Sequence, residues 1–264
     1  MRLLSLARDL RRRRARERNS LFVAEGIRTV QELLRSPLEV LGLLVAPKLE
    51  SDERGASLLQ IARSRGVAVQ PVSEKEFRSA AETESPQGVL AIGRIPHRTF
   101  GELAGRASLR ILVLDAVQDP GNVGTLVRTA AALWADATVA LPGTVDLWNA
   151  KVVRSAMGAL FHHHAFAATM DELRVFLASD GIPLWGADLA GEEPGSGPSR
   201  LALAVGNEGS GLSDELRSLC QRQSGLSDEL RSLCQRLVMI PVAPSVESLN
   251  VAVAAGILLY VLRP

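Results

Sequence analysis

The sequence predicts an α/β protein in which a parallel-sheet domain follows a smaller α/β unit. After residue 108, short apolar runs rich in β-branched residues alternate with helical patterns, which is typical of a parallel sheet covered on both faces. Before residue 96, a shorter series of helices and strands precedes them. Residues 96–108 are polar and contain glycine, which favours a linker. We therefore expect domains over residues 1–95 and 109–264.

The smaller unit is expected to begin with a basic amphipathic helix. Ile27, Val30, Leu33 and Leu34 then fall at helical spacing within the segment SLFVAEGIRTVQELLRS. A strand, a helix, a strand and a last strand are expected in turn at residues 38–47, 55–66, 67–73 and 86–95.

Six strands are predicted in the larger domain, with helical patterns or loops between them. They are Ile111–Val117, Ala137–Leu141, His164–Ala167, Ile182–Ala187, Leu201–Val205 and Val238–Pro241. In parallel α/β sheets, ligands bind at the loops that leave the carboxyl ends of the strands. We expect a functional site in these loops.

Composition indicates a soluble globular protein. The chain has 264 residues, of which 47% are hydrophobic and 22% charged, and its formal net charge is +1. No apolar run approaches the roughly 20 residues of a transmembrane helix, and the N-terminus lacks the cleavage site of a secretion signal. The two cysteines give no disulfide framework, so we expect a cytoplasmic protein.

A strongly basic cluster lies near the N-terminus. Its seven arginines are Arg8, Arg11, Arg12, Arg13, Arg14, Arg16 and Arg18. Such a local density of charge is expected of a surface that binds the phosphates of RNA or DNA. The alternative is a solvated helix face, since the chain uses arginine almost exclusively over lysine.

One segment, SGLSDELRSLCQR, occurs twice word for word, at Ser210–Arg222 and Ser224–Arg236. An identity of 13 consecutive residues indicates a tandem duplication in the gene, or an artefact, because structural repeats diverge in sequence. Each copy offers a serine N-cap and acidic residues in the first turn, so each is predicted to form a short helix. We expect the second copy to be an insertion without chemistry of its own.

The segment DPGNVGTLVRTAAA places a tight loop at the start of a helix, directly after the first strand of the larger domain. Gly121 and Gly124 let the backbone approach a ligand, and the N–H groups of a helix start attract anions. Asn122 is suited to capping or hydrogen bonding, and Arg128 follows six residues later. By itself the pattern also fits a capped turn with a surface arginine.

Two further loops follow strands of the same sheet. The turn Gly206–Gly209 is rich in glycine, but it lacks the lysine of a P-loop and the spacing of a dinucleotide fingerprint. A conventional NTPase or dehydrogenase is therefore disfavoured. Ser248 and Asn250 stand in an apolar, helix-prone segment, where buried polar groups need partners. Both loops also fit simple helix capping.

Metal and hydrolase chemistry are disfavoured as well. The run His162–His164 has diverging side chains and no cysteine or carboxylate at ligand spacing. No Ser/His/Asp or Cys/His arrangement emerges either. We expect no metal.

Taken together, the three loops resemble the three motifs of the SpoU (TrmH-like) RNA ribose 2′-O-methyltransferases. The motifs are Asn122-x-Gly124-x-x-x-Arg128, Gly206-Asn207-Glu208-Gly209, and Ile240-Pro241 followed by Ser248-Leu249-Asn250. Three motifs in this order are a specific signal, and the resemblance covers about residues 110–262. The segments FVAEGIRTVQELL and ESPQGVLAI resemble the L30e-like substrate-binding domain of many rRNA-modifying members.

The resemblance implies a methyltransferase domain with a C-terminal deep trefoil knot, one of the few exceptions to unknotted chains. It also implies S-adenosylmethionine as methyl donor and a homodimer whose interface completes the active site. The cofactor is expected near Leu184–Leu189. Its implied contacts are Gly186, Leu203, Gly206, Asn207, Ile240 and Leu249, and the family's functional polar positions match Asn122, Arg128, Glu208, Ser248 and Asn250.

The implied reaction is the attack of a ribose 2′-hydroxyl of RNA on the sulfonium methyl group, which requires alignment and loss of the hydroxyl proton. The counterpart of Arg128 has been assigned as the base in this family. Because a guanidinium stays protonated at ordinary pH, we expect Arg128 to hold a phosphate and polarise the hydroxyl. Asn122, Ser248 and Asn250 would position Arg128 or the ribose, and Glu208 would orient its loop.

Ribosomal RNA is the expected substrate because of the additional N-terminal domain. The alternatives are tRNA as substrate, an RNA-binding protein that has lost catalysis, and a plain nucleotide-binding α/β protein. The repeat lengthens the segment between Gly206 and Ile240 beyond the family pattern, which favours lost catalysis. The presence of all the functional polar residues argues against it.

Overall fold

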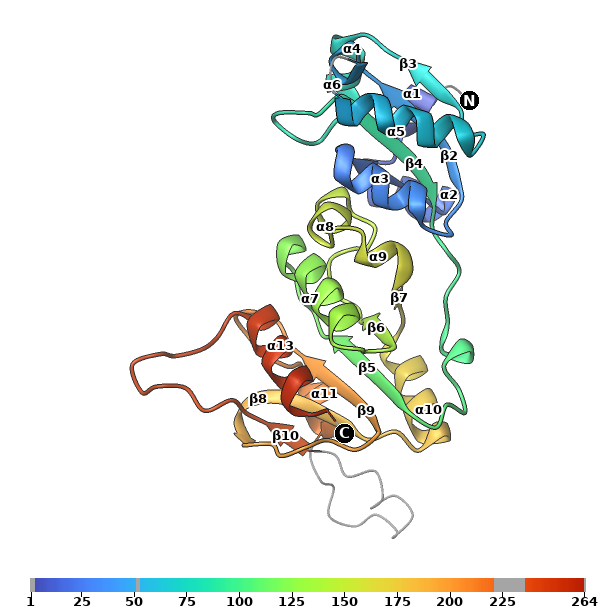
Figure 1. Ribbon diagram of the computed structural model, residues 1–264. Coiled ribbons are helices and arrows are strands. Elements are labelled where there is room, and N and C mark those ends of the chain that lie inside the picture. Colours follow the sequence, from blue (N-terminus) through green and yellow to red (C-terminus); the bar gives the residue numbers. More distant parts are fainter. Residues whose placement is uncertain (1–2, 51–52, 221–235, 264) are drawn as a thin grey trace. The chain divides into compact units, whose positions relative to one another are not determined.

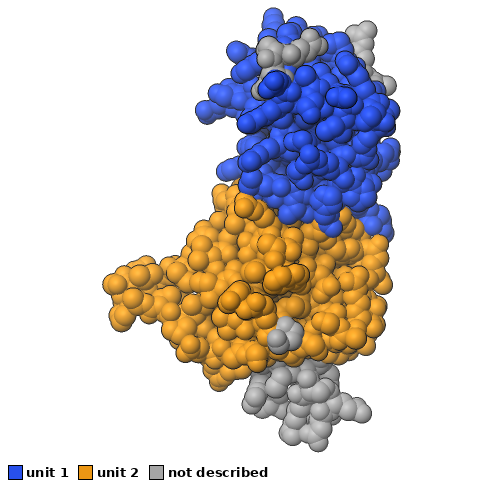
Figure 2. Space-filling model, viewed as in Figure 1, with its two compact units in different colours: residues 1–97, 148–162 blue, residues 98–147, 163–264 orange. Residues whose placement is uncertain are grey.

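The computed structural model describes residues 3–50, 53–220 and 236–263, and the chain divides into two compact units (Figure 2). The first unit comprises residues 1–97 and 148–162, and the second comprises residues 98–147 and 163–264. The sequence did not indicate that residues 148–162 pack with the N-terminal part of the chain. No helix in the described part of the chain is both long and apolar enough to cross a membrane.

The first unit is built on a four-stranded sheet of order β1-β4-β2-β3 (Figure 1). The strands are β1 (Leu21–Glu25), β2 (Val40–Val45), β3 (Val69–Pro71) and β4 (Val89–Arg94). β4 runs antiparallel to both β1 and β2, whereas β2 and β3 are parallel.

Helices cover both faces of this sheet. They are α1 (Leu3–Asp9), α2 (Arg13–Asn19), α3 (Ile27–Arg35), α4 (Pro47–Glu50), α5 (Glu53–Ser64), α6 (Glu74–Ala80), α8 (Ala150–Ser155) and α9 (Ala159–His162). Leu21 and Val23 of β1 pack in one core with α1 and α6. Phe22 points to the opposite face, where its ring lies 4.5 Å from Trp148 and 5.7 Å from Phe161.

The helical spacing from Ile27 to Leu34 is confirmed by α3, but two features of this unit differ from the expectation. Residues 21–25 form a strand that was not predicted. All five residues of this strand are buried, so it shows no alternation of polar and apolar residues that would have marked it. The single basic helix expected at the N-terminus is two short helices, α1 and α2.

The second unit contains a six-stranded sheet of order β10-β8-β9-β5-β6-β7, and all its strands are parallel. The strands are β5 (Leu109–Leu114), β6 (Ala137–Ala140), β7 (His164–Ala167), β8 (Leu184–Glu192), β9 (Arg200–Val205) and β10 (Arg236–Val238). The predicted parallel sheet and its six strands are confirmed. The last one is shorter than predicted, and residues 239–241 belong to a loop instead.

The helices of this unit are α7 (Pro120–Ala132), α10 (Met170–Asp180), α11 (Asp214–Cys220) and α13 (Val251–Val261), with a 3₁₀ turn η1 (Phe100–Glu102). α10 and α11 share an apolar core with Ile111, Val113 and other sheet residues. α7 and α13 pack against each other and against β6 and β9 (Figure 1).

The order of the strands in the sheet determines where a ligand site is expected. From β5 the chain continues to β6 and β7 on one side, and it then crosses to β8 and β9 on the other side. The carboxyl ends of β5, β8 and β9 therefore meet where the order reverses, which is the usual ligand position in such sheets.

The first copy of the repeated segment forms the predicted helix, α11. The second copy lies outside the described residues except for Arg236, which begins β10. The C-terminal knot stays a prediction from the family resemblance.

Candidate active site

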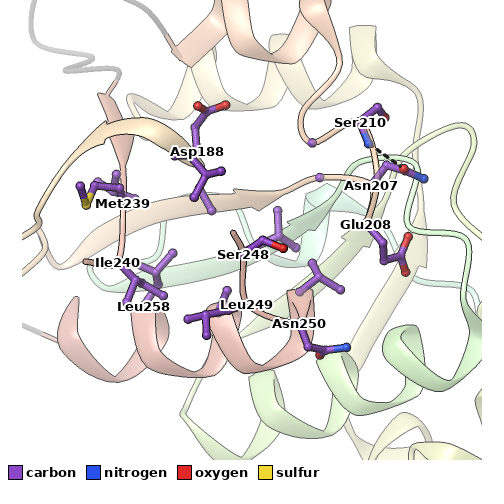
Figure 3. Close-up of a pocket in the computed structure, with 18 of the residues that line it drawn as sticks. Asp188, Asn207, Glu208, Ser210, Met239, Ile240, Ser248, Leu249, Asn250 and Leu258 are labelled. Atoms are coloured by element: carbon purple, nitrogen blue, oxygen red, sulfur yellow. Dashed lines mark hydrogen bonds between the residues drawn. The ribbon is translucent and has the colours of Figure 1, made fainter. Parts of the chain in front are cut away.

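A pocket of about 560 Å³ opens at the carboxyl end of β9, beside residues 187–189 in the middle of β8 (Figure 3). Residues 187–189, 205–211, 238–240, 242 and 247–251 line it, together with residues of α11 and α13. Figure 3 shows Glu208 and Asn250 at one end of the pocket and Met239 and Ile240 at the other. The pocket is therefore formed by segments that lie far apart in the sequence.

The glycine loop after β9 is held closed by its own hydrogen bonds. The backbone N–H groups of Asn207 and Gly211 each donate to the other residue's carbonyl, at 2.8 and 2.9 Å. The side chain of Asn207 accepts from the N–H groups of Gly209 and Ser210 and donates to Ala116 O at 2.9 Å. A Cβ atom at Gly206 would lie only 2.1–2.3 Å from the backbone of Gly211 and Leu212, so this position requires glycine.

Two carboxylates support the same loop. Asp115, buried at the end of β5, accepts a hydrogen bond from Ser213 N at 2.6 Å. Asp188 in β8 pairs with Arg217 of α11. Neither residue was predicted from the sequence. Asp115 had a usable signal, because an acidic residue that directly follows a buried strand needs a partner.

A chain of side-chain hydrogen bonds joins three loops at the edge of the pocket. Asn250, the N-cap of α13, donates from Nδ2 to Asn122 Oδ1 at 3.0 Å. Asn122 donates from its own Nδ2 to Glu208 Oε1 at 2.9 Å. Asp119 caps α7 by accepting from Asn122 N at 2.8 Å, which fixes the helix start that presents Asn122.

Glu208 is held as a carboxylate. Partial burial opposes its ionisation, but hydrogen bonds from Asn122 and from the backbone N–H groups of Gln118 and Asp119 favour it. The balance lowers the pKa of Glu208 below its ordinary value. Its negative charge therefore orients the Asn122 amide, whose oxygen is left to accept from Asn250.

The larger part of the chain matches one family of enzymes. Residues 109–224 and 222–260 match the family model of the SpoU rRNA methylases. The chain belongs to this family. The two matched pieces meet within the duplicated segment, and residues 5–91 match the MRM3-like substrate binding domain.

Two relatives and one solved structure extend the match over nearly the whole chain. The 23S rRNA (guanosine(2553)-2′-O)-methyltransferase RlmP of Bacillus subtilis is 33% identical over 97% of this chain and 94% of its own length. The 23S rRNA (guanosine-2′-O-)-methyltransferase RlmB of Shewanella oneidensis is 32% identical over 89% of this chain and 94% of its own length. An AdoMet-bound rRNA methyltransferase from Sinorhizobium meliloti superposes with a TM-score of 0.79 at 26% identity, covering 98% of this chain and 93% of that structure.

Within the SpoU fold, the predicted polar residues fall into two groups. Asn122, Glu208 and Asn250 are hydrogen-bonded to one another, and Ser248 lines the pocket beside them. Arg128 does not line this pocket. It is exposed on α7, and six residues carry it about 120° around the helix from Asn122.

Four of the six predicted cofactor contacts line the pocket and two do not. Gly206, Asn207, Ile240 and Leu249 line the pocket, as do residues 187–189 of the expected 184–189 stretch. Leu203 is instead buried in the middle of β9, and Gly186 packs against Leu212, Cys220 and Leu237. Neither lines the pocket, because both stand earlier in their strands, whereas the pocket is lined from residue 187 of β8 and residue 205 of β9 onward.

One arginine of the basic N-terminal cluster is buried and does not belong to its exposed surface. Arg16 is only 4% exposed, and its guanidinium donates to the backbone carbonyls of Leu10 and Arg11 at 2.8 and 2.9 Å. Its role in the structure is to join α1 to α2. The remaining arginines of the cluster are exposed, and Arg12 and Arg13 form ion pairs with Asp9 and Glu17.

One histidine of the run packs inside the second unit. His163 is buried, with its Nε2 atom 2.8 Å from the Thr138 hydroxyl. Burial, aided by Arg98 and His164, lowers its pKa to about 4. Among the residues that the structure describes, no three His, Cys, Asp or Glu side chains are grouped to hold a metal ion.

Proposed function

We propose that this chain transfers a methyl group from S-adenosylmethionine to a ribose 2′-hydroxyl of ribosomal RNA. Membership of the SpoU family and two relatives that carry the name 23S rRNA methyltransferase support this activity. The observation that carries the proposal is the hydrogen-bonded chain Asn250–Asn122–Glu208 at the edge of the pocket.

The pocket suits S-adenosylmethionine. Its volume of about 560 Å³ lies within the range of about 300–1,000 Å³ typical of small-molecule sites. Ile240, Leu249 and Leu258 supply apolar walls, and the backbone of the Gly206 loop supplies polar groups without side-chain obstruction. When bound there, the cofactor would supply an activated methyl group on a sulfonium.

The hydrogen-bonded residues Asn250, Asn122 and Glu208, together with Ser248, would position the ribose. Asn122 is fixed between Glu208 and Asn250, so its orientation is set before the substrate binds, which lowers the entropic cost of alignment. Ser248 would bind the ribose by a hydrogen bond. Arg128 would hold a phosphate and polarise the 2′-hydroxyl, as expected of a guanidinium.

We also propose a homodimer whose partner subunit brings its own Arg128 to this pocket. Arg128 does not line the pocket of its own chain, which supports a contribution across an interface. Helix α13 carries four exposed apolar side chains at i, i+4, i+7 and i+8, namely Val253, Ile257, Tyr260 and Val261. A helical stripe of this kind is typical of a surface that packs against another helix.

We place this activity in the cytoplasm. Cys220 is a buried free thiol, and burial together with Asp115 raises its pKa to about 12, so it is kept as an unreactive thiol. Reduced cysteines are the rule in that compartment.

The decisive experiment is methyl transfer from labelled S-adenosylmethionine to unmodified rRNA, with tRNA in parallel. Labelled 2′-O-methylribose in rRNA is the expected product, and transfer to tRNA alone would reassign the substrate. Arg128→Ala should abolish transfer, and Arg128→Lys should restore little of it because an ammonium lacks the planar set of donors. Arg174→Ala, on α10, is the control and should retain activity.

An inactive wild-type protein would contradict the proposal if deletion of residues 223–236 also failed to produce activity. That deletion removes one copy of the repeat and joins Arg222 directly to Leu237. Because the two copies are identical, the sequence before Leu237 stays the same as in the full chain. RNA binding without S-adenosylmethionine binding in both proteins would then identify an RNA-binding protein that has lost catalysis.

A further inference from the structure

A second cavity, of about 530 Å³, lies entirely within the first unit. It is formed by the start of α3, the loop that precedes β4 and the end of α8. Its volume is also within the range of small-molecule sites. The residues that matter here are Arg28, Thr29, Glu32, Gln87, Arg154 and Met157.

Arg154 is the distinctive residue of this cavity. Its Nη1 atom is shielded from solvent and has no hydrogen-bond partner among the residues that the structure describes. A buried guanidinium N–H group without an acceptor is costly and rare in folded proteins. The donor is therefore suited to an acceptor that enters the cavity.

The two carboxylates in the cavity are engaged with other groups. Glu25 accepts hydrogen bonds from Glu82 N at 2.8 Å and from the Thr83 hydroxyl. Glu32 pairs with Arg35 at 3.4 Å. Neither carboxylate accepts from Nη1 of Arg154, so an entering oxyanion would find this guanidinium available.

The remaining groups suit a nucleotide better than a simple anion. Arg28 adds a second guanidinium, and two guanidinium groups bind a phosphate well. Gln87 uses its carbonyl oxygen to accept from Ile27 N at 2.8 Å, which leaves its NH₂ group as a donor. Glu32 pairs with Arg35 through Oε1, so its Oε2 atom can accept from base or ribose donors, and Met157, 48% exposed, adds an apolar surface. A small inorganic anion would use only the arginines and would leave Gln87 and Glu32 without a partner in the cavity.

We propose that this cavity binds a second nucleotide of the substrate RNA, one that is not methylated, with its phosphate on Arg154 and Arg28 and its base or ribose on Glu32 and Gln87. The inference rests on the proposed function, since it takes RNA as the substrate. Proteins read single-stranded RNA by accepting unstacked nucleotides into such pockets. The cavity would thus help select which RNA is methylated.

The test compares full-length Arg154→Met and Arg28→Gln variants with the wild type. Either change should raise the KM for RNA roughly tenfold or more, as expected when a charge-assisted hydrogen bond is removed, while kcat at saturating RNA stays unchanged. The slope of log K against log salt for RNA binding should become shallower by about 0.7 for each single-strand phosphate that the variant no longer neutralises. Affinity for S-adenosylmethionine should not change.

Arg63→Gln is the matched control, because it removes an exposed arginine of α5 that does not line the cavity. It should leave KM and the salt slope as in the wild type. Arg28 is exposed, so its variant keeps the test valid if Arg154→Met fails to fold. Unchanged KM and slope in the folded variants would overturn this inference, whereas absence of methyl transfer by the wild type would overturn the proposed function itself.

Discussion

Asn250 donates a side-chain hydrogen bond to Asn122 across 3.0 Å, although 128 residues separate them in the chain. The bond joins the start of α13 to the start of α7, and Asn122 passes the connection on to Glu208. The orientation of each amide therefore depends on both of its neighbours.

This relationship predicts coupling between the two asparagines. Asn122→Ala and Asn250→Ala should each reduce kcat/KM for RNA strongly, and the double variant should lose less than the sum, with a coupling of about 0.5–3 kcal/mol. Asn250→Ser separates the two roles of Asn250, because serine still caps α13 but is too short to reach Asn122. The serine variant should match the alanine variant in activity and the wild type in Tm. Full activity of Asn250→Ser would mean that only capping matters.

Gly206 provides the sharpest test of the pocket. Gly206→Ala places a methyl group 2.1–2.3 Å from the backbone of Gly211 and Leu212, so the loop must shift. We expect a loss of about 1–3 kcal/mol of stability, typical of overpacking, and loss of S-adenosylmethionine binding measured by calorimetry. Gly209 lines the same pocket, but the Cβ atom of Gly209→Ala would lie 3.6 Å from its nearest neighbour, Asn207 Oδ1. This control should bind normally, and equal loss in both variants would contradict the argument.

The apolar stripe on α13 predicts the oligomeric state. The wild type should sediment as a dimer, and Ile257→Asp should dissociate it because a charge would be buried in the interface. Val175→Asp introduces the same charge at an exposed valine of α10 and should leave the dimer intact. A monomeric wild type that still transfers methyl groups would refute the shared active site.

His163 predicts how stability changes with pH. Its folded pKa is about 4, lowered first by burial and then by Arg98 and His164, whereas an unfolded histidine has a pKa of about 6.5. Between these values the unfolded chain binds more protons, so this residue makes stability fall as the pH drops, by up to about 3 kcal/mol. Thermal unfolding of His163→Gln should show a weaker pH dependence in this window. His162→Gln, at an exposed position, should behave as the wild type.

The basic cluster predicts the salt dependence of RNA binding. Replacing Arg11, Arg14 and Arg18 with serine removes three exposed arginines. The slope of log K against log salt should become shallower by roughly 2, since each neutralised phosphate contributes about 0.7 to 0.9. Arg16→Ser should reduce Tm instead, because this residue bonds internally. An unchanged slope in the triple variant would remove the cluster from the RNA-binding surface.

Much of this architecture could be predicted from the sequence because its signals are local. Apolar runs alternating with helical patterns indicated the parallel sheet, and glycine and polar residues after β5 and β9 indicated the site. Parallel strands bring their carboxyl ends to one edge, so loops far apart in sequence were expected to meet. The motif order then pointed to the SpoU family, which residues 109–224 and 222–260 match.

Only the tertiary structure decided which residues meet and which way they face. Leu203 lies in the core, two residues before Val205 of the pocket, and Arg16 is turned inward beside exposed residues of the basic cluster. Residues 148–162 pack with the first unit, which brings Arg154 to the cavity of Arg28 and Gln87. Sequence periodicity reports the environment of a residue along its own helix or strand, whereas these contacts depend on partners chosen by packing between distant segments.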